Sequence, residues 1–136
     1  MLSPTTDTVR LFLHVVAASI WVGGQVVLAG LVPGLRRVHP DATKVAARAF
    51  ARVAWPAFAV VVLTGLWNLG DIDVANTTTT YQITLFVKIA LAMASGAAAA
   101  VHQIGSSKLA LALGGAIGLL AALGAMFCGY LLTTGV

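Results

Sequence analysis

The chain has 136 residues, of which 60% are hydrophobic and only 9% are charged. A soluble domain of this length could not bury so much apolar surface, so the composition excludes an ordinary soluble enzyme and indicates an integral membrane protein. The net charge of +4 does not indicate a nucleic-acid-binding protein, because the basic residues gather in one segment without interleaved aromatic residues. The single cysteine, Cys128, excludes an internal disulfide.

Four apolar stretches follow one another along the chain, at about residues 9–35, 53–69, 81–104 and 109–132. A helix needs ~20 residues to cross the hydrocarbon core of a bilayer, and the second stretch meets that length with least to spare. Stretches of this length cross a bilayer as helices, because their backbone groups must hydrogen-bond internally. The sequence therefore predicts an all-α fold, a four-helix bundle that forms a single membrane domain over residues 1–136.

The first stretch contains an ionisable residue, His14, about five residues inside its predicted outer end. Helical periodicity places His14 on one stripe with Arg10, Trp21 and Gln25, and we expect this stripe to face the other helices. Ionisable side chains inside a membrane are costly and usually functional. The alternative is a structural histidine that hydrogen-bonds to a neighbouring helix.

The segment of residues 36–52, between the first two stretches, is strongly basic. Its charged residues are Arg36, Arg37, Lys44, Arg48 and Arg52, against one acid, Asp41. Lys44, Arg48 and Arg52 recur every four residues, which predicts one face of a helix that continues into the second stretch. Such a face is expected to contact lipid phosphates. The positive-inside rule places the segment in the cytoplasm and both termini on the extracytoplasmic side.

The third stretch carries Lys88 about seven residues inside its predicted outer end, and this lysine shares a stripe with Ser95 and His102. Lys88 could serve a cofactor, or its amine could reach the membrane surface along its apolar stem. His102 lies fourteen residues further on, about 21 Å along a helix axis. That separation is too large for one metal site, so His102 is predicted to belong to a different site from His14, which lies at the depth of Lys88.

The fourth stretch returns towards the layer that holds His14 and Lys88. The side chains predicted in this layer are His14, Thr64, Lys88, Met126 and Cys128. Met126 and Cys128 also have purely structural interpretations, as core filler and as a small buried apolar side chain. The stretch also contains the small-residue pattern Gly114-x-x-x-Gly118, which favours close helix packing and is compatible with a homodimer.

Several short motifs together resemble the membrane domain of the copper-resistance protein D (CopD) superfamily, which includes the HemJ-type protoporphyrinogen oxidases. They are LHVVAASIWVGGQVVLAGLVPGLRR in the first stretch, AWPAFAVVVLTGLWNL in the second and LFVKIALAMASGAAAAVHQ in the third. The resemblance implies a multi-pass protein of the prokaryotic cytoplasmic membrane that binds heme b. It also implies that His14 and Lys88 are the functional pair and that Trp21 lies among the cofactor-binding residues.

Three hypotheses follow. In the first, His14 is an axial ligand of heme b, and Lys88 pairs with a propionate or is a second ligand. The chain then takes part in electron transfer or porphyrin-linked redox chemistry as a carrier or an oxidoreductase. In the second, the chain binds or transports copper across or at the cytoplasmic membrane through His14, Met126 and Cys128, because soft ligands select cuprous ion. In the third, the chain is a non-catalytic accessory subunit. The first hypothesis implies an electron-transfer partner or a larger complex. None of the three hypotheses involves nucleic acid as a partner.

Overall fold

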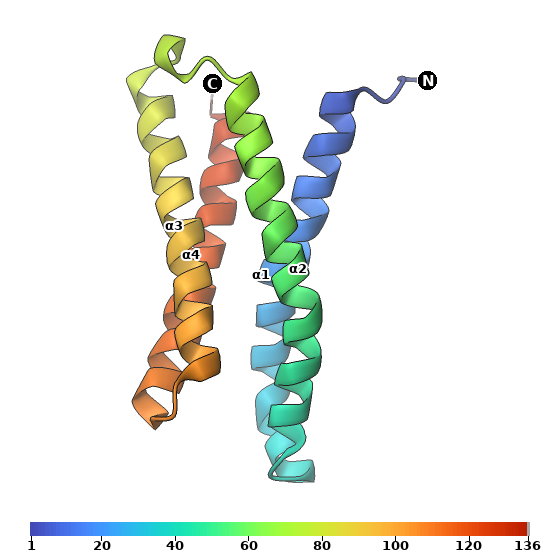
Figure 1. Ribbon diagram of the computed structural model, residues 1–136, viewed down its shortest axis with the longest axis vertical. Helices are drawn as coiled ribbons and strands as arrows, with labels where there is room; N and C mark the ends of the chain where they lie inside the picture. The colour runs from blue at the N-terminus through green and yellow to red at the C-terminus, as the bar shows by residue number, and fades with distance from the viewer. Residues whose placement is uncertain (136) are drawn as a thin grey trace. The chain divides into compact units, whose positions relative to one another are not determined.

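The computed structural model describes residues 1–135, and within that range the chain forms helices and no strand (Figure 1). The long helices are α1 (Thr6–Val38), α2 (Ala42–Asp71), α3 (Thr79–Ile104) and α4 (Lys108–Thr134), with a short 3-10 helix, η1 (Val74–Asn76), before α3. All four long helices have the length and apolar composition needed to cross a membrane. The predicted all-α class with four membrane-spanning helices is therefore confirmed.

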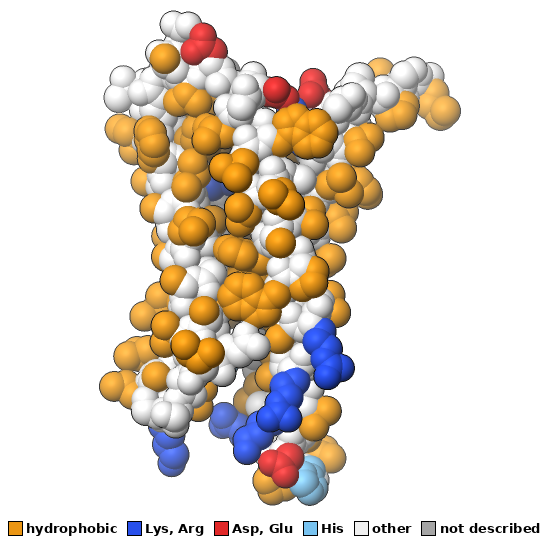
Figure 2. All heavy atoms as spheres, in the orientation of Figure 1, with side chains coloured by type: hydrophobic (Ala, Val, Ile, Leu, Met, Phe, Trp, Pro, Cys, Tyr) orange, Lys and Arg blue, Asp and Glu red, His pale blue; other side chains and the backbone are white. Residues whose placement is uncertain are grey.

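The chain divides into two compact units, unit 1 (Met1–Ile72) and unit 2, which begins at Asp73. Unit 1 is the hairpin of α1 and α2, and unit 2 is the hairpin of α3 and α4. The formation of one membrane domain from the four spans stays a prediction. Figure 2 shows that hydrophobic side chains cover much of the helix surfaces, as expected of helices that face lipid.

Helices α1, α3 and α4 begin where a hydroxyl side chain accepts a hydrogen bond from a first-turn amide, whereas Asp41 at the start of α2 makes no such bond. Thr5 accepts from the Thr8 amide at 3.2 Å, and Ser107 accepts from the Ala110 amide at 3.0 Å. Each cap satisfies an amide that has no partner inside its helix. The α2 helix begins at Ala42 and runs without a break to Asp71, so the predicted basic helix that continues into the second span is confirmed.

Unit 1 is held together mainly by small and aromatic side chains. Trp21 of α1 is buried, and its ring centroid lies 5.4 Å from that of Trp55 and 4.5 Å from that of Phe58, both on α2. Nearer the turn, the Phe50 ring occupies the space where a side chain at Gly24 would lie. Because glycine has no side chain, α1 can receive this ring against its backbone.

In unit 2, polar side chains of α3 pack against small residues of α4. Ser95 is completely buried, and its hydroxyl donates a hydrogen bond to the Gly118 carbonyl at 2.9 Å. A side chain at Gly114 would lie 3.0 Å from His102. Small residues let helix backbones approach closely in a membrane, so the Gly114-x-x-x-Gly118 pattern is used here inside the hairpin.

Candidate functional site

A hydrogen bond between the two helices of unit 1 fixes the predicted functional histidine. His14 of α1 is half-buried, and its Nδ1 atom lies 2.7 Å from the Thr64 hydroxyl of α2. Thr64 is only 6% exposed, so this contact lies among apolar side chains rather than in water. The structure thus brings together His14 and Thr64, two members of the predicted layer.

The hydroxyl of Thr64 also determines which nitrogen of His14 carries the proton. Thr64 has one hydroxyl proton, and its Oγ1 lies 2.6 Å from the Val60 carbonyl of the preceding turn, an atom that can only accept. The oxygen lone pair must then accept from Nδ1–H of His14. In a neutral imidazole this arrangement leaves the lone pair on Nε2, which is the protonation state of a histidine that ligates a metal.

The residues beside the His14 ring are small. A side chain at Gly65 would lie 3.6 Å from the His14 ring carbon Cε1, and Ala17, one turn along α1, is buried. Helix α2 therefore offers only a hydrogen atom where another residue would place a methyl group. The ring is therefore held by Thr64 through Nδ1 and lies next to the glycine of the following position on α2.

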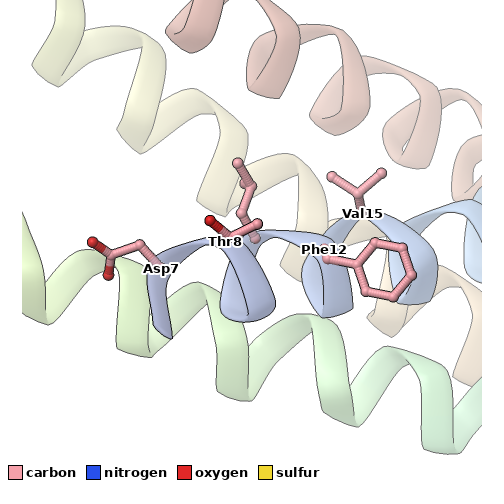
Figure 3. A pocket seen from close by; sticks show the side chains of 5 residues that line it. Asp7, Thr8, Phe12 and Val15 are labelled. Atoms are coloured by element: carbon pink, nitrogen blue, oxygen red, sulfur yellow. The ribbon is translucent and has the colours of Figure 1, made fainter. Parts of the chain in front are cut away.

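A shallow hollow on the surface of α1 does not include His14. It is lined by Asp7, Thr8, Leu11, Phe12 and Val15, which all come from one helix and are exposed (Figure 3). Apart from Asp7 and Thr8 the lining is aliphatic or aromatic. A hollow of this kind lacks the convergent polar groups of a ligand site and has the character of a lipid-facing surface.

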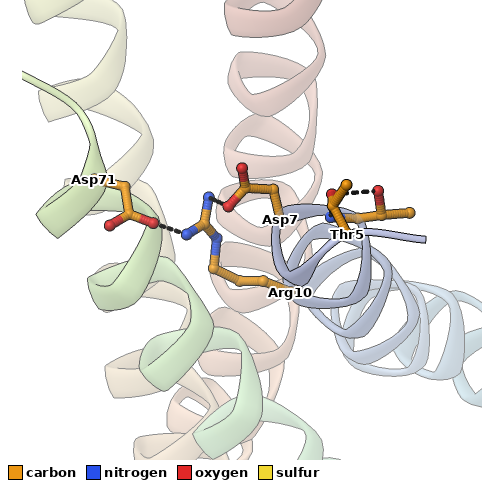
Figure 4. Close-up of polar contacts among 5 residues, drawn as sticks. Thr5, Asp7, Arg10 and Asp71 are labelled. Carbon is orange, nitrogen blue, oxygen red and sulfur yellow. Dashed lines mark hydrogen bonds and ion pairs between the residues drawn. The ribbon is translucent and has the colours of Figure 1, made fainter. Parts of the chain in front are cut away.

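One turn before His14, Arg10 forms an ion-pair cluster that sequence reasoning missed. Its Nη2 atom lies 3.2 Å from a carboxylate oxygen of Asp7, and its Nη1 atom donates to Asp71 at the end of α2 (Figure 4). The guanidinium carbon also lies 5.6 Å from the ring centroid of Trp67. The cluster joins the two helices at the end of unit 1 away from the turn.

Arg10 is only 9% exposed, and its Nε atom has no hydrogen-bond partner among the described residues. Two carboxylates surround the single guanidinium, so the cluster carries one formal negative charge. It therefore does not suit a further anion, such as a carboxylate of a cofactor. The signal in the sequence was the position of Arg10 on the stripe of His14, together with an acid at the end of the second span.

Trp21, which the resemblance places among the cofactor-binding residues, belongs to the aromatic cluster with Trp55 and Phe58. It lies two turns from His14 on the same stripe of α1, and it is 5% exposed. The predicted inward direction of this stripe is confirmed within unit 1. The structure gives Trp21 a packing role, and a cofactor contact stays a prediction.

In unit 2, the Lys88 side chain lies against α4. Its amine nitrogen is 3.3 Å from the position a side chain at Gly129 would take. Cys128 is 9% exposed, whereas Met126 is 44% exposed on another face of the same helix. Residues two apart on a helix point in nearly opposite directions, so α4 does not bring Met126 and Cys128 together as copper ligands.

His102 lies at the other end of α3, as the spacing predicts, and its ring faces the first turns of α4. Its Nδ1 atom hydrogen-bonds to the Leu111 carbonyl, and the ring lies beside Gly115. Because a carbonyl can only accept, this bond also places the proton on Nδ1. Within residues 1–135, no three His, Cys, Asp or Glu side chains come together to form a metal site.

Comparison with protein-family models, with curated proteins and with solved structures finds no match for this chain. The resemblance to the CopD superfamily therefore stays a prediction that rests on the short motifs, and the functional argument rests on the geometry around His14.

Proposed function

We propose that this multi-pass membrane protein binds heme b, with Nε2 of His14 as an axial ligand of the iron. The observation that carries the proposal is the hydrogen-bonded series from His14 through Thr64 to the Val60 carbonyl. Ligating histidines commonly donate their second ring N–H to a protein acceptor, which fixes the tautomer and the ring direction. Thr64 does this for His14 from a buried position.

The surroundings of His14 fit a flat apolar macrocycle. The donor is a neutral imidazole, the neighbouring Gly65 and Ala17 are small, and the stripe that carries His14 is otherwise apolar or aromatic as far as Trp21. Heme supplies a one-electron redox couple when it is bound. The chain's own residues would hold it through His14, orient the imidazole through Thr64, and exclude water through the aromatic cluster.

The proposal includes the role of Lys88 as a propionate partner and the orientation with the basic turn in a prokaryotic cytoplasm. A lysine seated against Gly129 on an apolar helix is a suitable cation for a carboxylate in the membrane. The function would be electron transfer to a partner in a homodimer or larger complex, or porphyrin-linked oxidation. Heme needs only one or two axial ligands, whereas copper would need the His14–Met126–Cys128 set.

The first experiment is the visible spectrum of the detergent-purified protein, oxidised and dithionite-reduced, with iron and copper analysis of the same sample. A Soret band, sharp bands on reduction and stoichiometric iron are expected. The protein should also bind added hemin if it is purified without cofactor. A chain that stays colourless after hemin addition would refute the proposal, and retained copper would favour the second hypothesis.

The ligand is tested by His14→Ala, which should abolish the Soret band. Two matched controls are His39→Ala, at the exposed turn between α1 and α2, and His102→Ala, in unit 2. Both should keep the heme complement. A full complement in His14→Ala would show that the assigned ligand is wrong.

A further inference from the structure

The turn between α1 and α2 carries a dense basic surface that the heme proposal does not use. We define the basic surface of unit 1 as Arg36, Arg37, Lys44, Arg48 and Arg52. All five side chains are exposed, and Figure 2 shows Lys and Arg side chains gathered along the end of α2 nearest the turn. So many positive charges close together must be neutralised by a negatively charged partner or solvated by water.

The helix length fixes the depth of this surface in the membrane. Helix α2 has 30 residues, which corresponds to about 45 Å, whereas the hydrocarbon core is ~30 Å thick. The far end of α2 is bounded by Asp71, whose carboxylate pairs with Arg10. The excess of about 15 Å, or about ten residues, therefore belongs to the turn end, so it includes Lys44 and Arg48 and ends next to Arg52. These bases lie at the depth of the lipid headgroups.

The protein itself compensates little of this charge. Lys44 lies 3.6 Å from the Asp41 carboxylate. For the four arginines of the basic surface, no carboxylate in the part of the chain that the structure describes forms an ion pair. The five bases of this surface together with Asp41 leave a net positive charge of four.

The basic stripe of α2 runs beside an exposed apolar stripe. Val45 is 66% exposed and Val53 is 55% exposed, each next in sequence to a base, with Ala49 between them. A soluble acidic protein or a nucleic acid would satisfy the bases and leave the valines in water. A lipid surface satisfies both, because its headgroups carry phosphate and its acyl chains begin directly below.

We propose that the basic surface of unit 1 is a binding surface for anionic phospholipid headgroups, which concentrates acidic lipid around this end of the protein. The positive charges of the basic surface attract the phosphodiester oxygens, and the valines contact the upper acyl chain. The proposal is independent of heme binding, because none of its residues contacts His14 or Thr64.

The test uses the full chain reconstituted in phosphatidylcholine vesicles. Trace spin-labelled phosphatidylglycerol or spin-labelled phosphatidylcholine is added, and electron paramagnetic resonance measures the immobilised fraction of each label. The wild type should favour phosphatidylglycerol by about fivefold or more, which corresponds to the attraction of one or more bases at the surface. Added salt should reduce this preference.

The test variant combines Lys44→Gln, Arg48→Gln and Arg52→Gln, and it should lose most of the preference. The matched control combines Lys44→Arg, Arg48→Lys and Arg52→Lys, which retains the charge and should retain the preference. A second control, Lys108→Gln in unit 2, should behave as the wild type. Circular dichroism checks that every variant keeps its helical content.

Equal association of the two labelled lipids with the wild type would overturn the proposal and leave an acidic soluble partner as the occupant of this surface. A preference that survives the glutamine substitutions would overturn it as well. Loss of the preference in both triple variants would show that charge is not its cause, with the same consequence.

Discussion

Replacing Thr64 by valine tests the link between the hydrogen-bond geometry and the proposed ligand. Valine has nearly the shape of threonine, and Thr64 is only 6% exposed, so the change leaves no cavity. It removes the acceptor of the His14 Nδ1–H bond, while the Val60 carbonyl keeps its place in the helix. Loss of this kind of supporting contact typically lowers ligand affinity by about 10- to 100-fold.

The assay is a spectral titration of the heme-free protein with hemin, and the dissociation constant for Thr64→Val should rise by about 10- to 100-fold. Thr64→Ser keeps the hydroxyl and should remain close to the wild type. A second control is Thr84→Val in unit 2, because the half-buried Thr84 hydroxyl donates to the Thr80 carbonyl of its own helix. This variant should bind hemin normally.

A readout without heme separates the tautomer argument from cofactor binding. Nitrogen NMR of the histidine rings in the heme-free wild type should show His14 protonated on Nδ1, and Thr64→Val should weaken that preference. An Nε2-protonated ring in the wild type would refute the reasoning, since the Thr64 hydroxyl would then donate to His14 rather than to Val60. Unchanged hemin affinity in Thr64→Val would refute it independently.

The packing contacts make two further predictions, measured as the free energy of unfolding in mixed micelles. Gly24→Ala should destabilise unit 1 by about 1–3 kcal/mol, because the new methyl group overlaps the Phe50 ring. The control is Gly23→Ala, whose methyl group meets no atom within 4 Å. This variant should be neutral or slightly stabilising. Equal effects of the two substitutions would contradict the packing. Ser95→Ala should lower the free energy of unfolding by about 0.6 kcal/mol, a typical value for a hydrogen bond between membrane helices. An unchanged free energy of unfolding would show that the hydrogen bond to the Gly118 carbonyl does not stabilise unit 2.

Hydropathy and periodicity were sufficient to predict the helices and the faces along which they pack within each unit. The long apolar stretches leave helices as the only structure that satisfies the backbone in lipid, so the four spans follow from composition alone. The spacing of Arg10, His14 and Trp21 indicated the inward stripe of α1, and Arg10 and Trp21 are among its buried residues. The basic spacing after Asp41 likewise predicted the first turns of α2.

The contacts between helices were harder to predict, because they depend on the longitudinal register of two helices. The pairing of Arg10 with Asp71 requires the end of α2 to lie level with the second turn of α1. Hydropathy placed Asp71 only at a span boundary, which is uncertain by several residues. Similarly, a depth estimate grouped Met126 with Cys128, whereas their different faces of α4 separate them.

Two different contacts, one near each end of the α1–α2 hairpin, restrict the movement of α2 relative to α1. Arg10 meets Asp71 near one end, and Gly24 receives the Phe50 ring nearer the other, about 21 Å further along α1. Two fixed points at this separation prevent α2 from sliding or pivoting against α1, because a shift of one turn, about 5.4 Å, would break both. His14 and Thr64 lie between these points, so the imidazole is held in a stiff frame before any ligand arrives.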